Sequence, residues 1–209
     1  MAVIVVGGQS RSVGKTSVVA GVIARLPQMR WTAFKITQYG HGLCTANGAP
    51  CACTTADHAI AVTEERSVSS GTDTSRFLAA GAVRSIWVRT RQGMLAEAMP
   101  RIHKELAAAE NAILESNSVM AFLQPDLYLT LLDDGTPDFK NSAKLFLNRA
   151  DALLVTAGSP TPQENSALPS LPAATPRFVI APPAYLTNEA VDFVRERIAA
   201  ATRATEFSL

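Results

Sequence analysis

Short apolar runs rich in β-branched residues alternate with segments of helical periodicity along most of the 209-residue chain. The apolar runs predict strands at residues 3–6, 31–36, 85–88, 112–114, 127–132, 152–156 and 178–180. The helical patterns predict helices at residues 15–26, 74–82, 94–109, 139–147 and 189–201. Continuous apolar strands joined by helices are typical of an α/β fold with a mainly parallel sheet and helices on both faces. Ligands of such sheets bind beyond the carboxyl ends of the strands.

Residues 40–72 show neither period and are rich in Gly, Cys, Thr and Ser. This connection is long for a compact domain, which favours a functional role. With 47% apolar residues the chain can bury a sizeable core. We therefore expect a single domain over residues 1–209 with a Cys/His-rich insertion at about residues 40–72.

The segment between the first predicted strand and helix has the composition of a phosphate-binding loop. Gly14-Lys15-Thr16 opens the helix directly after a β-branched strand. Backbone N–H groups at a helix N-terminus bind anions, and glycine lets the main chain approach phosphates closely. A lysine at this position contacts the β- and γ-phosphates of a nucleoside triphosphate, and a threonine hydroxyl ligates Mg²⁺. The predicted nucleotide-binding residues are Gly8, Arg11, Ser12, Val13, Gly14, Lys15, Thr16 and Ser17.

The loop is one residue longer than the common motif. Gly8 and Gly14 enclose five residues, so that Gln9 stands where the motif has its first glycine. Arg11 lies within the loop and either neutralises developing charge on the phosphates or points to water.

Carboxylates and a lysine at predicted strand ends are candidates to serve the nucleotide. Glu115 follows an apolar strand, where its carboxylate can hold Mg²⁺ directly or through water. Lys35 lies inside a predicted strand, and because an unpaired buried lysine is costly, it needs a phosphate or carboxylate partner unless it reaches the surface. Asp73 is either the N-cap of the helix that follows or a second Mg²⁺-linked carboxylate. The predicted catalytic residues are Lys15, Glu115 and Lys35, and the predicted Mg²⁺ residues are Thr16, Glu115 and Asp73.

All three cysteines and two of the three histidines fall between His41 and His58. The set His41, Cys44, Cys51 and Cys53 offers four ligands that suit tetrahedral Zn²⁺. Clustered thiols in a reducing compartment bind metal more often than they form disulfides. An iron–sulfur cluster, a redox pair and plain loop cysteines remain alternatives.

Charge and hydropathy exclude several classes of partner. A formal net charge of +1 gives no electrostatic basis for binding nucleic acid or an acidic membrane. No apolar run approaches the ~20 residues of a membrane-spanning helix. The N-terminus lacks the basic flank of a signal peptide. We expect a cytoplasmic protein that binds a nucleoside triphosphate, with no nucleic acid and no membrane as partner.

Several segments resemble known families. Residues 8–16, with their five-residue spacing, are similar to the phosphate loop of dethiobiotin synthetases. Residues 35–37 (Lys-Ile-Thr), 73–76 (Asp-Thr-Ser-Arg) and 80–82 (Ala-Gly-Ala) resemble segments of the molybdopterin-guanine dinucleotide biosynthesis adapter protein. Residues 114–115 correspond to the strand-end Glu of both families. Together these segments follow one another in consistent order from residue 8 to residue 115, and the resemblance implies a P-loop NTPase of the signal-recognition-particle-like and Min-like class.

The chain departs from these families at two places. Ser116-Asn117 follow the glutamate where both families have glycine, and Ser10 stands where the Min-like subgroup has a lysine. The Cys/His cluster also resembles the nickel- and zinc-insertion GTPases of the same class, in which metal ligands near the nucleotide couple hydrolysis to metal transfer. The resemblance to such proteins implies a homodimer and a cofactor-assembly protein as partners.

Three functions follow from these observations. The first is an adapter-like NTPase that binds GTP or ATP with Mg²⁺, hydrolyses it slowly and serves cofactor or metal-centre assembly. The second is a dethiobiotin-synthetase-like ligase or a small-molecule kinase, and the third is a non-catalytic nucleotide-binding module. Residues 148–151 (Asn-Arg-Ala-Asp) match the Asn-Lys-x-Asp guanine motif only superficially, because Asp151 precedes a predicted strand whereas guanine readers follow one. The sequence therefore leaves both GTP and ATP as candidate nucleotides.

Overall fold

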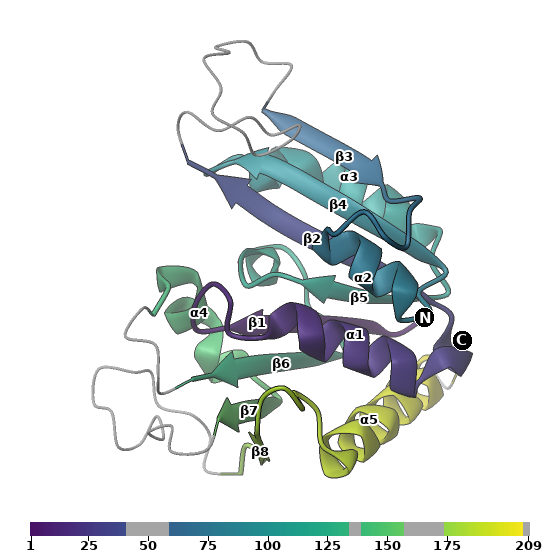
Figure 1. The fold of residues 1–209 in the computed structure, drawn as a ribbon, viewed down its shortest axis with the longest axis vertical. Coiled ribbons are helices and arrows are strands. Elements are labelled where there is room, and N and C mark those ends of the chain that lie inside the picture. The colour runs from purple at the N-terminus through teal and green to yellow at the C-terminus, as the bar shows by residue number, and fades with distance from the viewer. Residues whose placement is uncertain (41–58, 134–138, 157–173, 207–209) are drawn as a thin grey trace.

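An eight-stranded sheet forms the centre of the molecule (Figure 1). The computed structural model describes residues 1–40, 59–133, 139–156 and 174–206. The strands are β1 (Val3–Gly8), β2 (Trp31–Tyr39), β3 (Ile60–Glu64), β4 (Arg84–Arg91), β5 (Asn111–Glu115), β6 (Leu127–Leu132), β7 (Ala152–Thr156) and β8 (Arg177–Ile180). They lie in the order β3-β4-β2-β5-β1-β6-β7-β8, and every pair is parallel except β3 with β4.

Helices cover both faces of this sheet, as the sequence predicts (Figure 1). The α-helices are α1 (Lys15–Arg25), α2 (Asp73–Ala79), α3 (Leu95–Ala107), α4 (Asn141–Phe146) and α5 (Asn188–Glu206), and short 3₁₀ turns are η1 (Pro27–Met29), η3 (Ser118–Ala121) and η4 (Leu147–Arg149). One core cluster contains the buried apolar residues of α1, α2 and α5, and the other contains those of α3, η3 and η4. None of the helices described is long and apolar enough to cross a bilayer.

Each strand predicted from the sequence lies within an observed strand, and each predicted helix overlaps an observed one. The expectation that residues 40–72 hold no regular element is wrong, because β3 lies there. This strand pairs antiparallel with β4 at the edge of the sheet, and its residues are only partly buried or exposed. An edge strand needs no continuous apolar run, so the pattern that predicts the central strands does not detect it.

The start of α2 also differs from one of the two predictions for Asp73. Thr72 is the N-cap, because its side-chain oxygen accepts a hydrogen bond from the backbone N–H of Ser75 at 3.1 Å. Asp73 is thereby the first residue of the helix, and its carboxylate is available for other contacts.

Strand register brings distant residues together at the carboxyl ends of the central strands. Val6 of β1 pairs with Glu115 of β5, and Glu115 pairs in turn with Lys35 of β2. On β2, Trp31 and Ala33 pack into the core beneath α1 and α2, whereas Phe34 packs into the opposite core. Because side chains alternate along a strand, Lys35 projects on the α1 side.

A glycine in β1 is required by close packing behind the loop. A Cβ atom on Gly7 would lie 2.4 Å from Oδ1 of Asn117 and 2.5 Å from Oη of Tyr128. We expect Gly7→Ala to lower the free energy of unfolding by about 1–3 kcal/mol, the usual cost of overpacking. Denaturant unfolding measures this change. Gly21→Ala is the matched control, since its new Cβ would lie 3.4 Å from Leu186 inside a helix, and it should leave stability unchanged or raise it by up to about 1 kcal/mol. Equal stability of Gly7→Ala and the wild type would contradict this account.

Candidate functional site

The loop between β1 and α1 lies at the carboxyl edge of the sheet. Gly14 has φ 102°, a conformation that side chains other than glycine rarely adopt, and it immediately precedes α1. A Cβ atom at this position would lie 2.1 Å from Cε1 of Tyr185, so the tyrosine ring packs directly against the glycine. The first N–H groups of a helix have no acceptor within it, so the start of α1 presents donors to an anion in front of the loop.

Two side chains that the sequence analysis did not assign hold this loop in place. Asn117 accepts a hydrogen bond from Gly8 N–H and donates one to the Gly8 carbonyl oxygen, both at 2.8 Å. The Gln9 side-chain oxygen accepts from the backbone N–H of Asp133 at 3.0 Å. Gln9 stands where the common motif has its first glycine, and Asn117 belongs to the Ser116-Asn117 pair that departs from the families after Glu115. These departures were the available signal, and the two side chains supply buried amides that tie the loop to its neighbours.

Lys15 lies in the loop with its ammonium group donating to the Ser10 carbonyl oxygen at 2.5 Å. Burial of this group lowers the pKa of Lys15 from its ordinary value to about 8. The carboxylate of Glu115 acts in the opposite direction, and the positive charges of Lys140 and Lys35 add to the decrease. The lysine predicted to contact phosphate therefore sits in a desolvated position where a bound anion would favour its charged form.

A chain of contacts links the start of α1 to two neighbouring strands. The Thr16 hydroxyl donates to Oε2 of Glu115 at 2.8 Å, and the ammonium group of Lys35 donates to Oε1. Lys35 also forms an ion pair with Asp73 at 2.9 Å. The prediction that Lys35 finds a carboxylate partner is confirmed, and it finds two. Glu115 is only 3% exposed, and each of its two oxygens has a hydrogen-bond partner inside the protein.

The donor chemistry of this group fits Mg²⁺. Thr16 and Glu115 place a hydroxyl and a carboxylate oxygen side by side, and Asp73 adds a carboxylate at the solvent-facing rim. Hydroxyl and carboxylate oxygens are the ligands that Mg²⁺ takes beside a nucleotide. The single positive charge of Lys35 offsets only one of the two negative charges of Glu115 and Asp73, which leaves one for a bound cation.

The remaining residues predicted to bind nucleotide line the same loop. Val13 is buried beneath it, whereas Arg11 and Ser12 are exposed at its tip. Ser17 accepts a hydrogen bond from Arg76 of α2 at 3.1 Å, and this guanidinium group lies 4.0 Å from Asp73. Arg76 belongs to the segment that carries the family resemblance, yet the sequence alone assigned it no role. The structure puts it at the edge of the site.

Some predicted residues lie outside the part of the chain that the structure describes. His41, Cys44, Cys51 and Cys53 all fall in residues 41–58, as does His58. Within residues 1–40, 59–133, 139–156 and 174–206, no three His, Cys, Asp or Glu side chains are grouped to hold a metal ion.

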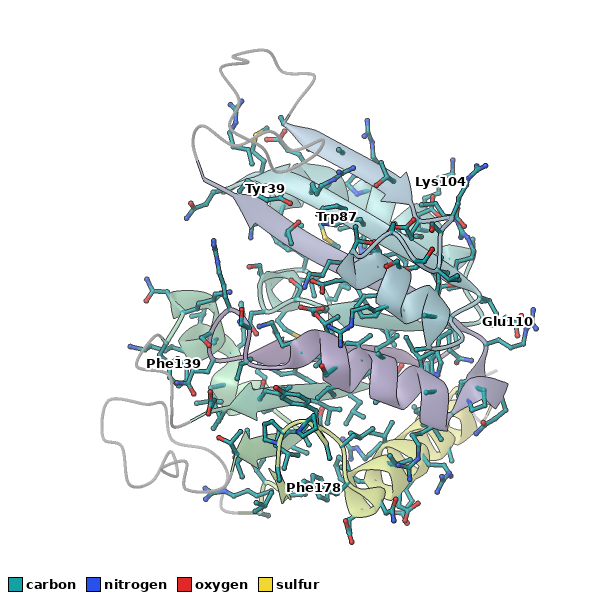
Figure 2. The ribbon with its side chains drawn as sticks, in the orientation of Figure 1. Tyr39, Trp87, Lys104, Glu110, Phe139 and Phe178 are labelled. Carbon is teal, nitrogen blue, oxygen red and sulfur yellow. The ribbon has the colours of Figure 1, made fainter. Side chains whose placement is uncertain are left out.

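The segment that superficially matches a guanine motif is used structurally. Asp151 accepts a hydrogen bond from the backbone N–H of Tyr128 at 2.8 Å and one from Arg197 at 2.6 Å. It precedes β7 and lies at the amino end of the parallel strands, opposite to the loop. In Figure 2, Glu110 lies at that opposite edge of the sheet, and Tyr39 and Phe139 lie at the edge that carries the loop.

The sheet, the loop after its first strand and the Lys-Thr pair at the start of α1 define the P-loop NTPase fold. No protein-family model and no curated protein matches the sequence. Solved structures do match. HypB from Helicobacter pylori, crystallised in complex with nickel, is similar with a TM-score of 0.53 at 12% identity, over 98% of this chain and 88% of HypB.

A second similar structure is LpxK from Aquifex aeolicus, in the crystal structure of its "apo" form in complex with ATP. The TM-score is 0.50 at 19% identity, over 86% of this chain. The match spans 53% of LpxK, about half of that protein. At 12% and 19% identity, these similarities show the fold alone.

The pKa of Lys15 predicts how phosphate binding depends on pH. Only the charged lysine attracts phosphate, and in the free protein it loses its proton above a pH of about 8. We expect the affinity for a nucleoside triphosphate to be constant below that pH and to fall by up to about tenfold per pH unit above it. Calorimetric titration across this range measures the effect. Lys15→Ala should remove this decline, and a flat wild-type profile would contradict the assignment.

Proposed function

We propose that this protein binds Mg²⁺ with GTP or ATP at the loop before α1 and hydrolyses the nucleotide slowly. It would act as an adapter-like NTPase in the assembly of a cofactor or metal centre. The observation that carries this proposal is the buried contact of Glu115 with Thr16 and Lys35 directly beneath the loop. Buried charges arranged beside a set of anion-binding backbone groups are the arrangement that phosphate chemistry requires.

Each residue has a distinct part in this proposal. Lys15 contacts the β- and γ-phosphates, and its charge offsets the negative charge that develops during transfer. Thr16 and Glu115 would hold Mg²⁺, and Asp73 would add a carboxylate beside it. Mg²⁺, when bound, withdraws charge from the phosphate oxygens. Lys35 contacts the terminal phosphate or a substrate once the nucleotide attracts it away from the carboxylates.

The role in metal or cofactor assembly rests on two further points. HypB, whose fold is similar, was crystallised with nickel. The Cys/His cluster at residues 41–53 has the composition of a Zn²⁺ or other transition-metal site. A closed four-ligand site would be structural, whereas an exposed three-ligand site would exchange metal with a partner protein. Proteins of this kind act as homodimers, and we propose the same assembly here.

A ligase or small-molecule kinase is the second candidate. The similarity to LpxK, which was crystallised with ATP, favours it, as does Lys35 in the middle of β2, beside the phosphate site. The two candidates differ in kinetics. An adapter hydrolyses nucleotide slowly without its partner, whereas a ligase or kinase releases ADP or phosphate faster when its small-molecule substrate is added.

Lys15→Ala tests the phosphate site directly. We expect the affinity for Mg²⁺–GTP and Mg²⁺–ATP to fall by roughly two orders of magnitude, because a charge-assisted contact to phosphate is lost. Calorimetry measures the affinity, and circular dichroism with thermal melting checks the fold. Lys104→Ala is the matched control, since Lys104 lies on α3 at the opposite edge of the sheet (Figure 2). Unchanged affinity in Lys15→Ala would remove the proposed site.

Metal content tests the assembly role. We expect protein purified without oxygen or chelator to contain about one transition-metal ion per chain, as a closed site would hold. A Cys44/Cys51/Cys53→Ser triple variant should lose the metal, because thiolate ligands are removed. Elemental analysis by mass spectrometry measures both. If the wild-type protein is metal-free, has three titratable thiols and still binds nucleotide, this result would contradict the metal site. It would favour the ligase or kinase function.

A further inference from the structure

The chain that follows β8 runs beside α1 (Figure 1). Tyr185 packs against Gly14, the residue immediately before the helix, and Leu186 packs against Gly21. The two glycines are seven positions apart, a spacing that places residues about two turns apart on the same side of a helix. A Cβ atom on Gly21 would lie 3.4 Å from Cδ2 of Leu186, so this contact is close along its whole length. The segment therefore fixes Tyr185 at the phosphate loop.

The ring of Tyr185 is only partly buried at this position. It packs against the core cluster that contains the buried residues of α1, and the four residues before it, 181–184, are exposed. Part of the ring is thus held by the protein and part remains open to solvent. An aromatic ring fixed in this way offers a flat apolar surface to a planar ligand.

The groups that fit Mg²⁺ lie on the other side of the loop. Thr16 contacts Glu115 of β5, and Glu115 contacts Lys35 of β2. In the sheet, β5 and β2 lie on one side of β1, whereas β6, β7 and β8 lie on the other. The β- and γ-phosphates of a nucleotide are the ones that a metal ion bridges, and the nucleoside is at the opposite end of the phosphate chain. A nucleotide with its terminal phosphates on the β5 side therefore directs its nucleoside toward the β8 side, where Tyr185 lies.

We propose that the ring of Tyr185 stacks on the base of the bound nucleoside triphosphate. This inference rests on the proposed function, because it concerns the same nucleotide. Stacking uses the flat face that every base has, and it depends little on the hydrogen-bonding groups at the edge of the base. Tyr185 therefore raises the affinity for GTP and ATP alike, and this contribution adds to the affinity that the loop has for the phosphates alone.

The test compares nucleoside triphosphates with inorganic triphosphate, which has the phosphates but no base. Tyr185→Leu keeps an apolar side chain against Gly14 and removes the aromatic ring, whereas Tyr185→Phe keeps the ring. Leu186→Ala is the matched control, because it loosens the same segment at Gly21, away from the loop. Calorimetry measures the affinity of each variant for the Mg²⁺ complexes of non-hydrolysable ATP and GTP analogues and of inorganic triphosphate.

We expect Tyr185→Leu to weaken binding of the nucleoside triphosphates by about tenfold or more and binding of inorganic triphosphate by less than about twofold. Tyr185→Phe should stay within about threefold of the wild type for every ligand, because the stacking surface is kept. Leu186→Ala should change each affinity by less than about twofold. A tyrosine that only supported the loop would produce equal losses for all three ligands.

Fluorine NMR of protein labelled with 3-fluorotyrosine gives a second readout on the wild type, which keeps the test valid if Tyr185→Leu does not fold. The chain has three tyrosines, so the signal of Tyr185 is assigned by its absence in Tyr185→Phe. The ring current of a stacked base should shift this signal further than inorganic triphosphate does. Equal shifts with the two kinds of ligand would contradict stacking.

Two calorimetric results would also overturn the assignment of Tyr185. One is unchanged affinity of Tyr185→Leu for the nucleoside triphosphates, and the other is an equal loss for nucleoside triphosphates and inorganic triphosphate. Either result, obtained beside wild-type protein that binds the nucleotide, leaves the proposed function standing. Wild-type protein that binds none of these ligands would overturn the proposed function and the role of Tyr185 with it.

Discussion

The candidate site depends on one buried charge, the carboxylate of Glu115. Taking a carboxylate out of water costs several kcal/mol unless partners satisfy both of its oxygens. Here Thr16 binds one oxygen and Lys35 binds the other, so the start of α1, the middle of β2 and the end of β5 are held around a single group. Lys35 extends this set to α2 through Asp73. Removing Lys35 would leave the Glu115 carboxylate buried without a compensating charge, so the position of β2 matters to all four elements.

Much of this arrangement was readable in the sequence because it rests on local patterns. The loop before Lys15 follows an apolar strand and leads into a helix, and such a strand–loop–helix segment is typical of a phosphate-binding loop. Glu115 stands at the end of one apolar run and Lys35 within another, and parallel strands bring their carboxyl ends to one edge. Residues 60–64 form an edge strand without a continuous apolar run, and therefore escaped detection. The N-cap of α2 was misassigned by one residue, because Thr72 and the acidic residue after it are both good caps.

The contacts that hold the loop could not be predicted, because they join residues far apart in the chain. Asn117 binds the backbone of Gly8 from 109 positions away, and the side chain of Gln9 binds the backbone 124 positions away. The sequence marked both residues as part of departures from the family pattern, but a departure alone does not name a partner. The partner follows from the strand order, which places β1 between β5 and β6, and strand order is not encoded in local periodicity.

The packing of Tyr185 against Gly14 has a consequence for how the molecule is made. β1 and the loop after it precede in the chain every element that they contact, and β1 pairs with β5 and β6. The tyrosine that closes over Gly14 follows β8, far later in the sequence. Because Tyr185 is synthesised after β8, the loop cannot reach its final conformation until the chain beyond β8 has left the ribosome. High sequence separation of this kind slows folding and leaves the early strand exposed to other contacts during synthesis.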